Sequence, residues 1–184
     1  MRALGDRGAV HLRGKQPTTA YQYELALRLA DVQNETGCRL VINDRIDVAR
    51  AAGAWGVQLT SRSIPVGDAR LIGHGLLIGA SIHSEREADY AELAGADWIV
   101  LGNIFETRSH PDAPGAGIAA LRSVCARSTI PCIAIGGVRP AQVGELLRAG
   151  AHGVAAISGI WNANDAEHAA IDYLAAYDGE RADT

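Results

Sequence analysis

Two pairs of small residues form the strongest candidate for a chemical site, and they are Gly136 with Gly137 and Ser158 with Gly159. Each pair follows a short apolar run and leads into sequence with a helical pattern. Glycine at a strand end lets a ligand approach the backbone, and the free N–H groups of the next helix favour an anion. Two such strand ends predict a phosphate cradle, as after the last two strands of (β/α)8 barrels. The alternative is that the glycines only relieve crowding at two turns.

The composition indicates a globular α/β protein. Of the 184 residues, 48% are hydrophobic and 21% are charged, and the net charge of −4 argues against a broad nucleic-acid surface. No apolar run reaches membrane-spanning length and no signal peptide opens the chain, so we expect a cytoplasmic protein with no membrane contact. Cys38, Cys125 and Cys132 show no C-x-x-C spacing, and we expect buried or half-buried free thiols.

Short apolar runs alternate with helical patterns along the chain. The apolar runs are residues 9–12, 40–42, 57–59, 76–80, 98–101, 132–135 and 154–157. The helical patterns are residues 19–35, 46–52, 66–72, 85–94, 118–126, 140–149 and 165–177. Strict alternation predicts right-handed βαβ units with a parallel sheet. We expect one domain of the TIM (β/α)8-barrel type over residues 1–177, followed by a flexible polar tail over residues 178–184.

An eight-stranded barrel needs one βα unit more than this pattern supplies. The sequence before residue 9 repeats the frame that precedes later strands, in which a helix ends at a glycine, so residues 1–4 resemble the end of a helix. We therefore expect the first βα unit to be absent. Either the start codon is placed late, or the open edge is covered by something else, such as the partner chain of a homodimer.

Motifs along most of the chain carry a resemblance to a known family. They are H-L-R-G-K at 11–15, V-I-N-D-R-I-D at 41–47, G-V-Q-L at 56–59, I-G-A-S-I-H-S at 78–84, G-A-D-W-I-V-L-G-N-I-F-E-T at 95–107, I-P-C-I-A-I-G-G-V at 130–138 and G-V-A-A-I-S-G-I at 153–160. The chain resembles the thiamine phosphate synthase/TenI family of (β/α)8 barrels. Synthases of that family join a pyrimidine methyl pyrophosphate to a thiazole phosphate, using Mg²⁺. TenI-type proteins bind a thiazole phosphate, and the thiazole tautomerases among them isomerise it without a metal.

Several positions favour the TenI branch. Where synthases typically carry Gln in Q-x-R, this chain has His11, which is common in TenI proteins. The resemblance places the synthase's Mg²⁺ at Asp44 and a second carboxylate, and that second position is Ser63 here. It places a pyrophosphate-binding lysine at His110. The three differences all weaken a pyrophosphate site, so we expect no cofactor, and Mg²⁺ at Asp44 only if the chain is a synthase.

One position departs from the tautomerase pattern. The tautomerase places a proton-transferring His where this chain has Asn103, and an amide cannot take a proton. If the chain isomerises thiazole, the candidates for the catalytic group are His11, His83 and Glu106.

The remaining candidates are substrate contacts at strand ends and in the long loops. They are Arg13, Asn43, Asp44, Asn103, Thr107 and His110, and Asp44 could instead cap the following helix. The leading hypothesis is a TenI-like protein of thiamine biosynthesis that binds thiazole phosphate and isomerises it. The alternatives are a thiamine phosphate synthase and a non-catalytic regulator that binds thiazole phosphate.

Overall fold

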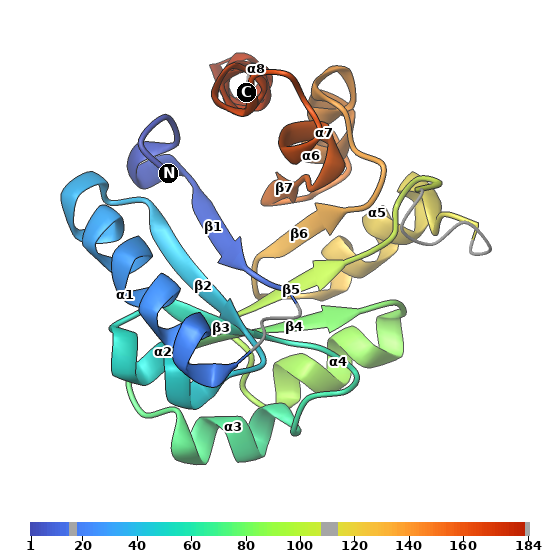
Figure 1. Ribbon diagram of the computed structural model, residues 1–184. Helices are drawn as coiled ribbons and strands as arrows, with labels where there is room; N and C mark the ends of the chain where they lie inside the picture. The colour runs from blue at the N-terminus through green and yellow to red at the C-terminus, as the bar shows by residue number, and fades with distance from the viewer. Residues whose placement is uncertain (15–17, 108–113, 183–184) are drawn as a thin grey trace. The chain divides into compact units, whose positions relative to one another are not determined.

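A computed structural model describes residues 1–14, 18–107 and 114–182, which form parallel strands alternating with helices (Figure 1). The chain divides into two compact units. The first comprises Met1–Ala80 and Ala94–Asp97, and the second comprises Ser81–Leu93 and Trp98–Thr184. Each unit is described below by itself.

In the first unit, parallel strands pair with their neighbours in chain order. Its elements are η1 (Gly5–Arg7), β1 (Ala9–Leu12), α1 (Thr19–Thr36), β2 (Arg39–Asn43), α2 (Ile46–Ala52), β3 (Gly56–Leu59), α3 (Val66–Ile72) and most of β4 (Leu77–Ile82). The register places Ala9 opposite Arg39 and Val41 opposite Gly56. Because the carboxyl ends of parallel strands meet at one edge of a sheet, residues that follow β1, β2 and β3 lie close together.

Local signals define the first unit's helices. The Thr18 hydroxyl accepts the N–H of Tyr21 at 3.1 Å and so caps the start of α1. Gly37 and Gly53, with φ of 73° and 67°, end α1 and α2 in the left-handed conformation that a glycine adopts most easily. All of β3 is buried, as expected of a strand covered on both faces.

The second unit also has parallel strands paired in chain order, β5 with β6 and β6 with β7. Its elements are α4 (Glu85–Leu93), β5 (Trp98–Leu101), α5 (Gly117–Arg127), β6 (Cys132–Ile135), η2 (Pro140–Gln142), α6 (Val143–Arg148), β7 (Gly153–Ala155), α7 (Ser158–Trp161) and α8 (Ala166–Ala182). Helix α8 packs against η2, α6 and α7. The segments that follow β6 and β7 therefore share one helix as their support.

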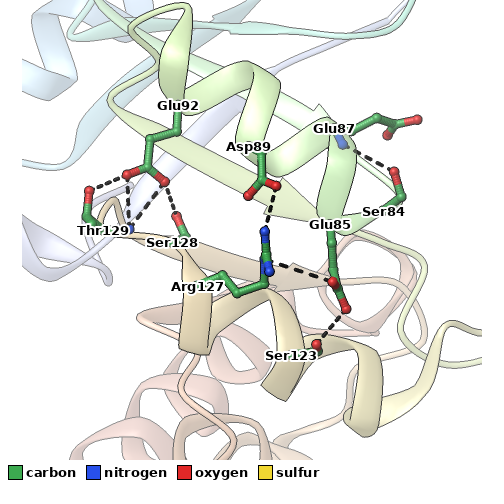
Figure 2. Close-up of polar contacts among 9 residues, drawn as sticks. All are labelled: Ser84, Glu85, Glu87, Asp89, Glu92, Ser123, Arg127, Ser128 and Thr129. Atoms are coloured by element: carbon green, nitrogen blue, oxygen red, sulfur yellow. Dashed lines mark hydrogen bonds and ion pairs between the residues drawn. The ribbon is translucent and has the colours of Figure 1, made fainter.

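A polar network on the surface of the second unit joins α4 to α5 and to the loop after it (Figure 2). Arg127 donates to Asp89 at 2.8 Å, and its Nε lies 3.9 Å from Glu85. The Glu92 carboxylate accepts the backbone N–H of Thr129 at 3.2 Å and a second bond from the Thr129 hydroxyl, which lowers the pKa of Glu92. Exposed ion pairs contribute little each, so the network fixes the orientation of α4 more than it adds stability.

Most sequence-predicted elements are confirmed to within one or two residues at each end, and three differences are notable. The strand predicted at 154–157 is shorter than expected, because β7 ends at Ala155, and residues 158–161 form the short helix α7. The single helix predicted at 140–149 is observed as two elements, η2 and α6. Helix α8 continues to Ala182, so residues 178–182 of the expected polar tail are helical; the single domain and the flexibility of the tail stay predictions. The three cysteines are free, with Cys38 and Cys132 buried.

In the part of the chain that the structure describes, no helix is both long enough and apolar enough to cross a bilayer.

Candidate functional site

The first unit carries a carboxylate cluster, defined here as Asn43, Asp44, Thr60 and Ser63. Asp44 follows β2 directly, is exposed, and has a left-handed backbone with φ of 61°. Its Oδ1 accepts hydrogen bonds from the Ser63 hydroxyl and, at 3.4 Å, from the Thr60 hydroxyl. Its Oδ2 accepts the amide of Asn43 at 2.5 Å. Three side chains therefore hold one carboxylate in a fixed direction, at a backbone conformation that Asp tolerates better than most residues.

Helix capping does not account for Asp44. The N-cap residue of α2 is Arg45, and its side chain makes no capping hydrogen bond. Arg45 instead donates to Asp47 at 2.8 Å. The alternative role of Asp44 as a helix cap is therefore wrong, and the exposed carboxylate needs another explanation.

His11 and Arg13 lie on and just after β1, beside the carboxylate cluster. The pKa of His11 is lowered to about 4, first by desolvation and then by the positive charge of Arg13, while Asp44 and Asn43 act in the opposite direction. The imidazole is nevertheless accessible to solvent. At pH 7 His11 is therefore a neutral hydrogen-bonding group near the positive charge of Arg13.

The carboxylate cluster offers oxygen ligands of the kind that Mg²⁺ prefers. They are the Asp44 carboxylate, two hydroxyls and Oδ1 of Asn43, which is buried without a hydrogen-bond partner among the described residues. In the described ranges, no group of three or more His, Cys, Asp or Glu side chains could hold a metal. Mg²⁺ commonly uses one or two carboxylates, waters and substrate phosphates. The donor set therefore fits Mg²⁺ when a phosphorylated ligand supplies further oxygens.

In the second unit, the turn after β6 is crowded by the segment after β5. The N–H of Ile104 donates to Ile135 at 2.9 Å, and the N–H of Phe105 donates to Gly136 at 3.0 Å. A Cβ at Gly136 would lie 2.5 Å from Cβ of Asn103. At Gly137 it would lie 2.6 Å from the carbonyl oxygen of Glu106. Crowding alone therefore explains why both positions are glycine, as the alternative to a phosphate site supposed.

Crowding does not exclude an anion at these turns. Gly137, Ser158 and Gly159 are exposed, and their backbone N–H groups donate to no other group within the described residues. Such N–H groups at strand ends are suitable donors to a phosphate. Gly136 with Gly137 and Ser158 with Gly159 are called the phosphate cradle below.

The other predicted site residues of the second unit surround the end of β5. The amide nitrogen of Asn103 donates to the carbonyl of Phe105 at 3.2 Å, which holds the amide within its own loop. Nδ1 of His83 lies 2.5 Å from the carbonyl oxygen of Gly102 and therefore acts as the donor. Glu106 is exposed and Thr107 is half-buried. His110 lies outside the described residues.

The structure thus brings the candidates together in two groups. His11, Arg13, Asn43 and Asp44 belong to the first unit, and Asn103, Glu106 and the first glycine pair of the cradle belong to the second. Sequence reasoning missed Thr60 as a partner of Asp44, and it missed Tyr173, whose hydroxyl contacts Gly159. The sequence carried no signal for the second, because α8 contains both Tyr173 and Tyr177 and only the structure shows which of them is buried.

Comparisons with known proteins identify the family. The family described as thiamine monophosphate synthase matches residues 2–160 of the chain. The chain belongs to the thiamine monophosphate synthase/TenI family. Membership associates it with thiamine biosynthesis and confirms the resemblance drawn from the motifs.

Relatives named thiamine-phosphate synthase align with most of the chain. One from Methanoculleus marisnigri is 40% identical over 170 residues, which cover 91% of this chain and 81% of that protein. One from Pyrococcus horikoshii is 38% identical over 165 residues, covering 90% and 80%. The solved structure of thiamine phosphate pyrophosphorylase from Pyrococcus furiosus is 34% identical, has a TM-score of 0.90, and is matched over 97% of this chain and 87% of that one. The predicted fold class, an α/β fold of the TIM-barrel type, is confirmed.

Proposed function

We propose that this protein is a thiamine-phosphate synthase, a transferase that joins a pyrimidine methyl pyrophosphate to a thiazole phosphate. The observation that carries the proposal is the carboxylate cluster, in which Asp44 is held by Ser63 and Asn43. A metal-free tautomerase has no need of a fixed, exposed carboxylate among oxygen ligands. Relatives that are 36–40% identical are named thiamine-phosphate synthase, which favours the synthase function over the TenI-like hypothesis.

The tautomerase alternative also lacks a suitable histidine base among the described residues. Asn103 stands where the tautomerase pattern has histidine, and its amide is held by Phe105. His11 has a pKa of about 4, well below the value near 7 that suits a general base at neutral pH. Nδ1 of His83 donates its proton to a hydrogen bond with the carbonyl oxygen of Gly102, so it is not available as a base. Glu106, the third candidate, is exposed to solvent.

Two of the sequence differences that favoured TenI are compatible with a synthase. A neutral His11 donates and accepts hydrogen bonds without charge, as the glutamine of typical synthases does. Ser63 replaces a second carboxylate, yet it donates to Asp44 and keeps that carboxylate in place. One carboxylate is enough for Mg²⁺ when the pyrophosphate supplies oxygens.

We assign each substrate to one unit. The carboxylate cluster with Arg13 binds the pyrophosphate of the pyrimidine substrate, because a cation and a metal-binding carboxylate suit its charge. The phosphate cradle binds the phosphate of the thiazole through backbone N–H groups. Asn43, Asn103 and Thr107 supply hydrogen bonds that orient the substrates.

The reaction forms one C–N bond and breaks one C–O bond. The thiazole nitrogen attacks the methylene carbon of the pyrimidine substrate, and pyrophosphate leaves with the electron pair of the broken bond. When bound, Mg²⁺ neutralises negative charge on the pyrophosphate and makes it a better leaving group. The chain's own contribution is to hold the two phosphorylated groups: Arg13 offsets pyrophosphate charge, Asp44 retains the metal, and the cradle fixes the thiazole.

The proposal is tested by following thiazole carboxylate phosphate by NMR, first alone and then with the pyrimidine substrate and Mg²⁺. We expect no isomerisation of the thiazole alone and coupling when both substrates are present. Isomerisation by the protein alone would identify a tautomerase. Tight binding with neither reaction would identify a non-catalytic regulator.

A further inference from the structure

The hydroxyl of Tyr173 connects to both turns of the phosphate cradle. Tyr173 is a buried residue of α8, and its hydroxyl donates to the carbonyl oxygen of Val138 at 2.7 Å. Val138 directly follows Gly137, and it is itself buried. The first turn of the cradle is therefore tied to α8 by a hydrogen bond that is shielded from water.

The second turn meets the same hydroxyl group. Gly159 packs so closely on Tyr173 that a Cβ at position 159 would overlap the hydroxyl oxygen and lie 3.3 Å from Cζ. Glycine at 159 is thus required by the tyrosine rather than by its own backbone angle. One oxygen atom touches both turns of the cradle.

The surroundings keep this hydroxyl in its donor form. Desolvation raises the pKa of Tyr173, and the nearby charge of Arg139 acts in the opposite direction. The phenol is therefore protonated at neutral pH and donates to Val138. Helix α8 packs against η2, which follows the first turn, and against α7, which contains the second turn, so one helix supports both turns.

We propose that Tyr173 is a positioning residue that sets the separation of the two turns of the phosphate cradle and so determines affinity for the phosphate of the thiazole substrate. The inference rests on the proposed function, in which the cradle binds that phosphate. Tyr173 acts through the backbone of Val138 and Gly159 and does not itself touch the substrate. Precise placement matters because a phosphate that contacts both turns tolerates little change in their separation.

The test compares Tyr173→Phe with Tyr177→Phe. Tyr177 is a matched control, since it lies one turn further along α8 and donates to the backbone carbonyl of His152 at 3.3 Å, away from the cradle. We expect Tyr173→Phe to raise KM for the thiazole phosphate by about tenfold, with KM for the pyrimidine substrate and kcat changed by less than about twofold. Tyr177→Phe leaves all three constants within about twofold.

A merely structural role gives a different pattern. It would lower Tm and the fraction of active protein, and KM for both substrates would change equally or not at all. Either of those outcomes in an active enzyme overturns the proposal. Equal effects of Tyr173→Phe and Tyr177→Phe on KM for the thiazole phosphate also overturn it.

A second comparison tests the contact with Gly159 directly. We expect Gly159→Ala to lower Tm strongly in the wild-type background and much less in the Tyr173→Phe background, because the oxygen that the new methyl group would overlap is then absent. An equal loss of Tm in both backgrounds contradicts the contact. This measurement needs no substrate.

Inorganic phosphate separates a failure of this inference from a failure of the proposed function. If the wild-type protein forms no product, the synthase proposal fails, and the rise in Tm that phosphate causes is compared between wild type and Tyr173→Phe. A smaller rise in the variant retains Tyr173 as a positioning residue of an anion site. An equal rise, or none in either protein, overturns it.

Discussion

The hydroxyl of Ser63 donates a hydrogen bond to the carboxylate of Asp44, from the position where the resemblance implies a second carboxylate in synthases. Ser63 therefore occupies the position of the missing carboxylate, and its hydroxyl orients the one carboxylate that remains, that of Asp44. Thr60 and Asn43 contact the same carboxylate. A site with one carboxylate and several neutral oxygen ligands binds a divalent cation weakly until a phosphorylated substrate joins it.

Asp44→Asn is expected to abolish Mg²⁺-dependent product formation. The amide is isosteric and Asn adopts φ of 61° readily, so the fold and Tm should change little. We expect a loss of at least about 100-fold in kcat/KM at saturating Mg²⁺, because removal of a group that acts in the transition state costs about 3 kcal/mol. The control is Asp47→Asn, whose carboxylate is bound to Arg45. Equal activity of Asp44→Asn and wild type would exclude the metal site.

Ser63→Asp would create the paired carboxylates of a typical synthase. Without metal, two adjacent carboxylates repel each other, so Tm should fall in the presence of a chelator. With Mg²⁺ the repulsion is offset, and the Mg²⁺ concentration for half-maximal rate should fall by about tenfold. Steady-state rates over a Mg²⁺ titration measure this shift. An increased Mg²⁺ requirement would mean that Asp44 and Ser63 do not share a metal.

His11 should titrate near pH 4 and act as a neutral group. NMR of the imidazole C–H signals measures the pKa directly, and a midpoint close to 6.5 would contradict the desolvation of the imidazole. The sign of the linked stability follows from the lowered pKa. Between about pH 4 and about pH 6.5 the unfolded chain binds more protons at this site, so His11 makes stability fall as the pH falls through that range.

His11→Gln removes that pH dependence and supplies a neutral amide. We expect its unfolding free energy to decline less than that of wild type between pH 6.5 and pH 4. Synthase activity at pH 7.5 should stay within about threefold of wild type, because an amide donates and accepts hydrogen bonds as a neutral imidazole does. A loss of more than about 100-fold would show that His11 transfers a proton.

Gly137→Ala and Gly53→Ala separate backbone strain from crowding, because both glycines have φ of 67°. A Cβ at Gly53 would meet nothing within 4 Å, whereas at Gly137 it would lie 2.6 Å from the Glu106 carbonyl oxygen. We expect Gly53→Ala to cost about 1 kcal/mol from the left-handed conformation alone. Gly137→Ala should cost about 2 kcal/mol more, because backbone must shift. Urea denaturation of both variants gives the difference, and equal costs would contradict the crowding.

Much of the fold was predictable because buried parallel strands are continuous apolar runs followed by glycine-capped helices. β1, β5, β6, α2 and α3 have the predicted bounds. The prediction fails at Ile157, which is apolar yet 50% exposed and lies beyond β7. Apolar character indicates burial only on average, and the end of β7 depends on tertiary contacts that a single sequence does not display.

The site was predictable where its residues directly follow strands, as Asp44 and Gly137 do. It was not predictable where partners are distant in the chain: Thr60 lies 16 residues from Asp44, and Tyr173 lies 35 residues from Val138. The proposed choice between the two branches of the family also depends on tertiary structure. The sequence shows a histidine at position 11, but its neutrality follows from surroundings that only the fold provides.

The measurement that tests the central claim most directly is product formation from both substrates by the wild-type protein. A pyrimidine methyl pyrophosphate and a thiazole phosphate are incubated with Mg²⁺, and thiamine phosphate and pyrophosphate are quantified by chromatography. We predict equimolar appearance of the two products, dependent on both substrates and abolished by a chelator. Absence of product at saturating Mg²⁺, from protein that binds thiazole phosphate, would contradict the assignment as a synthase.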